Sequence, residues 1–134
     1  MHFTELITQL GVHFALAALA PDADGNCAVR LDELVYSFYL HDDGQSFTVR
    51  STLGQIDPQD EDALRKVLGG NLFEDGVGGS ALGVDARGAV FLTQHMTLPS
   101  LSFPRFIEIF GRFVGTAEHW AARLQGLPLT EKSS

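Results

Sequence analysis

The sequence predicts an α+β fold with the element order helix, three strands, helix, two strands, helix, in which a twisted antiparallel sheet is packed by the helices. Apolar residues recur with the helical period of 3.6 near both ends of the chain and after residue 58, whereas the segments between alternate with the two-residue period of strands. Clusters of Asp, Asn, Gly and Pro separate these segments. The length of 134 residues and a hydrophobic fraction of 45% indicate a single domain over residues 1–126, followed by a polar tail over residues 127–134.

The first predicted helix, Thr4 to Ala20, is apolar on two opposite sides. One stripe runs from Phe3 to Ala17 and has the width of an ordinary core face. A second stripe of Val12, Leu16 and Leu19 lies on the far side of the same helix. Two interpretations follow: the helix lies between two layers of its own fold, or the surplus stripe is an apolar groove kept for a partner.

Three strands are predicted after this helix, as an antiparallel meander. In the second strand Tyr36 and Phe38 share one face, and Val35 and Tyr39 share the reverse face, while the third strand turns Arg50 outward. The strands cover residues 27–32, 34–41 and 46–53, with turn residues at 22–26 and 42–44.

A second helix is indicated by its start signals. Asp57 can cap it, Pro58 suits the first helical position, and the acidic residues 60–62 complement the positive end of the helix dipole. Gly69-Gly70 inside this helix indicates either close backbone approach, as to a symmetry mate, or early fraying. Its narrow apolar stripe, of the kind that packs one helix against another, is Leu64, Val67, Leu68 and Leu72.

A second hairpin and a long helix complete the domain. Strands over residues 81–85 and 88–96 are joined by a turn at Asp85–Gly88. Ser102 then caps a helix with Pro104 in its first turn, and a broad apolar face runs from Phe106 to Leu124. This last helix is predicted to be core packing alone.

Composition excludes several classes of function. The formal net charge of -8, from 17 acidic against 9 basic residues, disfavours nucleic acid as a partner because its phosphates would be repelled. The longest apolar run is too short to insert across a bilayer. The single cysteine, Cys27, cannot form an internal disulfide, fits a reducing cytoplasm, and is expected to be a buried structural thiol.

Two alternatives concern small ligands. Asp22, Asp24, Asn26 and Glu33 occupy positions 1, 3, 5 and 12 of an EF-hand calcium loop. Cys27 stands where that loop needs glycine, and a strand is predicted where it needs a helix, yet a calcium-responsive domain over Asp22–Glu33 stays as an alternative. A small regulatory or sensor module with a ligand pocket is the other. The five histidines are scattered, and no nucleophile has an evident base partner, so no metal site, cofactor or enzymatic activity is predicted.

The element order and several strings of sequence resemble the class I type III secretion chaperones. The strings are Leu-Gly-Val-His-Phe-Ala-Leu in the first helix, Cys27-Ala-Val-Arg-Leu and Leu34-Val-Tyr-Ser-Phe in the strands, and Leu68-Gly-Gly-Asn-Leu-Phe73 followed by Ala81-Leu-Gly-Val-Asp85. The resemblance implies a homodimer of the bacterial cytoplasm that is not an enzyme. It further implies that the protein binds the N-terminal region of a secreted effector and keeps it soluble and competent for export.

Under this resemblance, two sets of residues are expected to form interfaces. In each set the competing interpretation is packing within the chain's own core. Effector contacts are expected at Val12, Leu16, Leu19, Val35 and Tyr39, and the dimer interface is expected at Leu64, Val67, Leu68 and Leu72.

Overall fold

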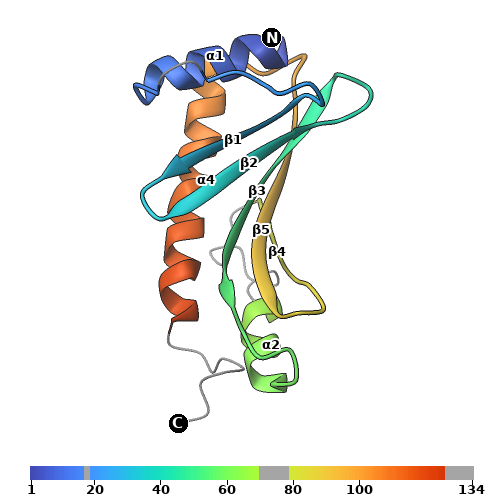
Figure 1. Ribbon diagram of the computed structural model, residues 1–134, viewed down its shortest axis with the longest axis vertical. Helices are drawn as coiled ribbons and strands as arrows, with labels where there is room; N and C mark the ends of the chain where they lie inside the picture. The colour runs from blue at the N-terminus through green and yellow to red at the C-terminus, as the bar shows by residue number, and fades with distance from the viewer. Residues whose placement is uncertain (17–18, 70–78, 126–134) are drawn as a thin grey trace.

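The protein folds as a five-stranded antiparallel sheet whose inward side chains form one core with the described helices (Figure 1). The computed structural model describes residues 1–16, 19–69 and 79–125. The strand order β1-β2-β3-β5-β4 places β1 and β4 at the two edges. The predicted fold class and element order are therefore confirmed. The elements are α1 (Phe3–His13), β1 (Asn26–Leu31), β2 (Leu34–Leu40), β3 (Ser46–Gln55), α2 (Glu61–Gly69), β4 (Ala81–Val84), β5 (Ala89–Thr97) and α4 (Phe103–Leu124).

The core forms where α4 lies against the inner face of the sheet. As the alternation predicted, Tyr36 and Phe38 of β2 are completely buried, and both rings contact Phe110 of α4 at centroid distances of 5.5 and 5.4 Å. In Figure 1, α4 runs behind β1 and β2. α1 closes one end of this core, because the Phe3 ring lies 5.4 Å from that of Phe47 in β3.

The first helix ends seven residues earlier than the sequence predicts, at His13 rather than at Ala20. The Ala15 amide donates to the Val12 carbonyl and the Leu16 amide donates to the Gly11 carbonyl, with Ala15 in the left-handed conformation at φ 55°. This pairing is a Schellman C-cap, which terminates the helix. The predicted stripe of Val12, Leu16 and Leu19 was wrong as helical geometry, because the last two side chains follow the cap.

Replacing Ala15 with Gly is expected to raise the free energy of unfolding by about 1 kcal/mol. Alanine pays a steric cost in the left-handed region that glycine does not pay, and Ala15 is exposed, so no packing is lost. Urea unfolding followed by circular dichroism measures the change. A destabilised Ala15→Gly variant would contradict the assignment of the cap.

α2 also starts later than the sequence predicts. Asp60, not Asp57, caps it, since the Asp60 carboxylate accepts from the amides of Asp62 and Ala63 at 3.0 and 3.1 Å. Asp57 instead holds the preceding turn by accepting from the Gln59 amide. Asp57 and Asp60 can each act as a helix cap. The chain uses Asp57 for the turn and Asp60 for the helix. α2 continues to Gly69. Leu72, the last residue of the predicted stripe, lies outside the described residues.

The second hairpin and the start of α4 agree with their sequence signals. The Asp85 carboxylate accepts from the amides of Arg87 and Ala89, which holds the turn between β4 and β5. The Ser102 hydroxyl accepts from the Arg105 amide at 3.3 Å and caps α4 as predicted.

Candidate partner-binding surface

The sheet has one face that none of the described helices covers. α1, α2 and α4 all contribute buried residues to a single core with the inward side chains of the sheet. On the reverse face of β2, Val35 is 43% exposed and Tyr39 is 40% exposed. Large apolar side chains are costly to leave in water at such exposure, so this face is the first candidate for a partner.

A first groove, here called the edge groove, follows β1. It has a volume of about 500 Å³ and is lined by Leu19, Ala20, Asp22, Asn26, Cys27, Ala28, Ser37 and Tyr39. Within the described sheet β1 pairs with β2 alone, so its other edge leaves backbone donors and acceptors unpaired. The structure therefore brings Leu19 and Tyr39, which are far apart in sequence, into the lining of one groove beside an open strand edge.

A second groove, here called the face groove, crosses the reverse face. It has a volume of about 340 Å³ and is lined by Glu33, Val35, Ser37, Tyr39, Arg50 and Thr52. Ser37 and Tyr39 line both grooves, so the two grooves adjoin at these residues. The sequence predictions did not place Arg50 in a site, although its outward position in β3 was the available signal.

The other three predicted effector contacts, Val12, Leu16 and Leu19, do not lie on the reverse face of the sheet. Val12 is 78% exposed on α1, whereas Leu16 and Leu19 are half-buried and pack against the core. α1 lies on the covered side of the sheet, so Val12 does not share the reverse face with Val35 and Tyr39. The five predicted contacts thus do not form one surface.

α2 presents a second apolar surface. A shallow hollow of about 650 Å³ is lined by Glu61, Leu64, Arg65, Leu68 and Gly69, and Leu68 is 45% exposed. Val67, by contrast, is completely buried by its own chain. Val67 borders the same stripe, but burial against its own chain makes it core rather than accessible surface, so its placement in the interface was wrong.

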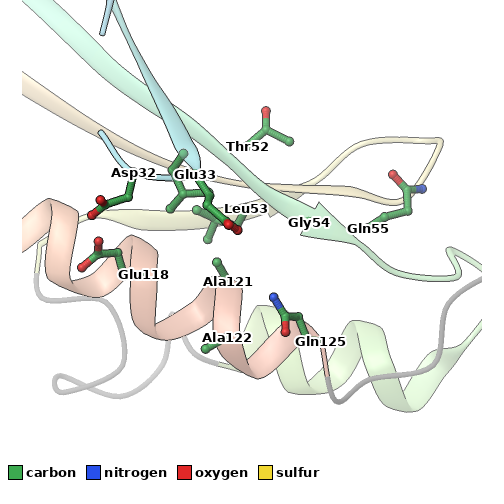
Figure 2. Close-up of a pocket in the computed structure, with 11 residues that line it drawn as sticks. Asp32, Glu33, Thr52, Leu53, Gly54, Gln55, Glu118, Ala121, Ala122 and Gln125 are labelled. Atoms are coloured by element: carbon green, nitrogen blue, oxygen red, sulfur yellow. The ribbon is translucent and has the colours of Figure 1, made fainter. Parts of the chain in front are cut away.

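An acidic cavity lies between the end of α4 and the turn between β1 and β2 (Figure 2). It has a volume of about 620 Å³, and the carboxylates of Asp32, Glu33 and Glu118 stand over an apolar floor that includes Leu53. Desolvation and then the charges of Glu118 and Asp32 raise the pKa of the buried Tyr36 to about 12, so its phenol stays neutral at physiological pH. No Cys, His, Lys or Arg is among the lining residues of this cavity.

The candidate calcium loop is not formed. The Asp22 carboxylate accepts from the amides of Asp24 and Asn26 in a tight turn, and β1 then runs extended from Asn26. At about 3.3 Å per residue, the strand carries Glu33 roughly 20 Å from that turn. An EF-hand over Asp22–Glu33 is therefore excluded. In the described part of the chain, no three His, Cys, Asp or Glu side chains are grouped so as to hold a metal ion.

Cys27 fits the structural role predicted for it. It is 8% exposed, and burial, with the charge of Asp22, raises the pKa of its thiol. A thiol with a raised pKa is a poor nucleophile at neutral pH. No described helix combines the length and the apolar character that crossing a membrane requires.

Comparison with known proteins identifies this architecture. A chain of the ExsC–ExsE complex superposes with a TM-score of 0.76 at 19% identity, covering 98% of this chain and 100% of that one. The complex of the Yersinia pestis type III secretion chaperone SycH with a fragment of YscM2 gives a TM-score of 0.66 at 17% identity, covering 86% of this chain and 96% of that one. The ExoT–SpcS complex of Pseudomonas aeruginosa gives 0.63 at 18% identity, covering 87% and 95%. At these identities the likeness shows the fold.

Sequence comparison extends the likeness to the family. A protein of Chlamydia pneumoniae is 25% identical over 123 residues, which cover 90% of this chain and 94% of that protein. Residues 5–121 match the Tir chaperone protein (CesT) family, from α1 to the last turns of α4. The chain therefore belongs to the Tir chaperone protein family.

Proposed function

We propose that the protein is a cytoplasmic chaperone that binds the N-terminal segment of a type III secreted effector and keeps it soluble and competent for export. Membership of the Tir chaperone family supports this function, and the related solved structures include the type III secretion chaperone SycH with a fragment of YscM2 and the HopA1–SchA chaperone–effector complex. The family match favours a chaperone over a regulatory or sensor module. The function needs neither an enzymatic activity nor a cofactor, because binding alone protects the client.

The observation that carries the proposal is the open edge of β1 beside a groove whose lining includes Leu19, Ala20 and Tyr39 among polar residues. An extended client segment can add to β1 as a further strand, and its backbone then satisfies the unpaired groups of that edge. Alternate client side chains would enter the edge groove between Leu19 and Tyr39, which supplies selectivity for apolar residues. Val35 extends the same contact surface onto the open face.

We further propose that the domain, residues 1–126, acts as a homodimer through α2. Leu64 and Leu68 line the shallow apolar hollow of that helix, and Leu72 is proposed to continue it. The negative charge of -8 would keep a dimer with apolar surfaces soluble. Light scattering of the purified protein tests the dimer, and a monomeric mass would contradict it.

Replacing Tyr39 with Glu is expected to weaken client binding at least about tenfold. The change places a charge in both grooves, where it must be desolvated when an apolar client side chain enters. The test is co-expression with the N-terminal segment of a candidate effector, followed by co-purification and titration of the purified partners.

Matched variants sharpen this test. Ala86→Glu adds the same charge on the exposed turn between β4 and β5 and should leave affinity unchanged. The client affinity of a Val12→Glu variant tests whether the outer side of α1 also contacts the client, because a loss of affinity would place Val12 in the contact surface. Equal affinities of the wild type and the Tyr39→Glu variant would remove the edge groove from the proposal, and failure of any effector segment to co-purify would remove the chaperone function.

A further inference from the structure

The open face of the sheet has the opposite charge character to the rest of the protein. The chain as a whole carries 17 acidic residues, yet the strand residues facing this side include no Asp or Glu and two arginines, Arg30 and Arg50. The nearest carboxylate in the face groove is Glu33, which belongs to the turn between β1 and β2. A face that combines exposed Val35 and Tyr39 with the positive charge of two arginines is complementary to a partner with acidic and apolar side chains.

Arg50 is held in place by a stack across three strands. Its Cζ atom lies 4.1 Å from the centroid of the Phe91 ring of β5. The same ring also lies against Gly83 of β4, where a Cβ atom would lie 2.6 Å from two ring carbons. Because glycine has no side chain, residue 83 leaves space for the Phe91 ring. That ring in turn holds the Arg50 guanidinium through a cation–π contact.

The stack leaves the hydrogen-bonding capacity of the guanidinium unused. Among the described residues, Arg50 forms no ion pair, and its guanidinium lies over the Phe91 ring. A guanidinium presents its donors in a planar fork that matches the two oxygens of a carboxylate. Arg50 lines the face groove beside the exposed side chains of Val35 and Tyr39. The groove thus combines the side chains of Val35 and Tyr39 with one preorganised cation, and Glu33 is the carboxylate in its lining.

We propose that Arg50 forms a subsite for a carboxylate of the client, an Asp or Glu flanked by apolar residues, where the client crosses the open face. This inference rests on the proposed chaperone function. Neighbouring strands lie about 4.8 Å apart, so a client strand added to β1 would run roughly 14 Å from β3, beyond the reach of its own side chains to Arg50. The carboxylate must therefore belong to the client segment that leaves the edge groove and continues into the face groove, which shares Tyr39 with it.

The test selects short random peptides by display on the full-length wild-type protein. Enriched peptides are expected to carry Asp or Glu next to apolar residues. The affinity of one enriched peptide, and of its counterpart with Asn or Gln at the acidic positions, is then measured by fluorescence anisotropy against three proteins: wild type, Arg50→Gln and Arg123→Gln. Arg123 is the matched control, because its Cζ atom also lies over an aromatic ring, 4.6 Å from the centroid of Trp120, but on α4.

The expected result is a coupled loss. Arg50→Gln and the removal of the peptide carboxylates should each weaken binding at least about tenfold, the two together should weaken it little further, and Arg123→Gln should change it less than about twofold. In the wild type, the Arg50 Nε–Hε resonance should shift on addition of the acidic peptide and stay in place with its amide counterpart. Thermal melting of each variant shows whether it is folded.

Three outcomes would overturn the inference. The first is a selection that enriches no acidic and apolar peptides, and the second is an acidic peptide that binds Arg50→Gln as tightly as the wild type. The third is a change of oligomeric mass in Arg50→Gln without a change in peptide affinity, which would assign the face to a second copy. In each case co-purification of an effector segment with the Arg50→Gln variant would leave the chaperone function standing.

Discussion

Replacing Phe110 with Ala is expected to lower the free energy of unfolding by about 4 kcal/mol. The ring of Phe110 is 1% exposed and lies at the centre of the aromatic core, with centroid distances of 5.4 Å to Phe38, 5.5 Å to Tyr36 and 5.5 Å to Phe106. Truncation removes these contacts and leaves a cavity between α4 and the sheet, which neither element can close because both are held by many other core residues.

Urea unfolding of the Phe110→Ala variant, followed by circular dichroism, measures this loss at one fixed protein concentration, because unfolding of a dimer would depend on concentration. Phe110→Leu keeps most of the volume and should lose about 1.5 kcal/mol or less. Phe103→Ala, at the half-buried start of the same helix, should also lose less than Phe110→Ala. A loss in Phe110→Ala no greater than that in Phe103→Ala would contradict the central position of the ring.

Replacing Gly88 with Ala is expected to lower the free energy of unfolding by about 3 kcal/mol. Gly88 has φ 89°, which side-chain-bearing residues rarely adopt, and a Cβ atom there would lie 2.1 Å from the carbonyl oxygen of Ile56. That oxygen is part of the backbone, so relief of the clash requires the hairpin to move. The movement would strain the hydrogen bond from the Ile56 amide to the Gly88 carbonyl, now 2.9 Å long.

Gly44 provides the matched control for the conformational part of this cost. It also has a positive φ, of 68°, but a Cβ atom there would meet nothing within 4 Å. Gly44→Ala should therefore cost about 1 kcal/mol, the steric cost of the left-handed region alone. The difference between the two variants in chemical denaturation isolates the clash with the Ile56 carbonyl. Equal losses would show that the hairpin relaxes at no cost.

The strands and α4 were predictable because their sequence patterns agree with their surroundings. Tyr36 and Phe38 alternate with Val35 and Tyr39 in the sequence, and the same alternation divides buried from exposed side chains in β2. Ser102 likewise caps α4 through a local hydrogen bond that needs no distant residue. Local chemistry and tertiary packing favour the same structure at these positions.

The end of α1 was not predictable from local preference. Ala and Leu are strong helix formers, and the stretch after His13 consists largely of them, so propensity favours a longer helix. The chain leaves the helix at Ala15 because the following segment packs back on it, with Leu19 lying over Gly11. A Cβ atom on Gly11 would lie 3.0 Å from that of Leu19, so the absence of a side chain at residue 11 permits the return.

In the candidate partner-binding surface, too, some residues were predictable from the sequence and others were not. Val35 and Tyr39 were assigned correctly to the exposed face of β2 by alternation alone, because side chains in a strand must point to opposite sides. The position of Leu19 in one groove with Tyr39, the burial of Val67, and the stack of Gly83, Phe91 and Arg50 depend on segments far apart in sequence. No periodicity within one element contains that information.

The amino-acid sequence alone therefore sufficed for the element order, the acidic character, the inner and outer faces of the strands, and the resemblance to secretion chaperones, since each depends on neighbouring residues or on composition. Tertiary structure decided where α1 stops, which edge of the sheet stays open, and which arginine stands in the face groove. The physical reason is that grooves and edges are made by segments that meet only after folding, so their geometry depends on packing between elements rather than on the preferences of any one of them.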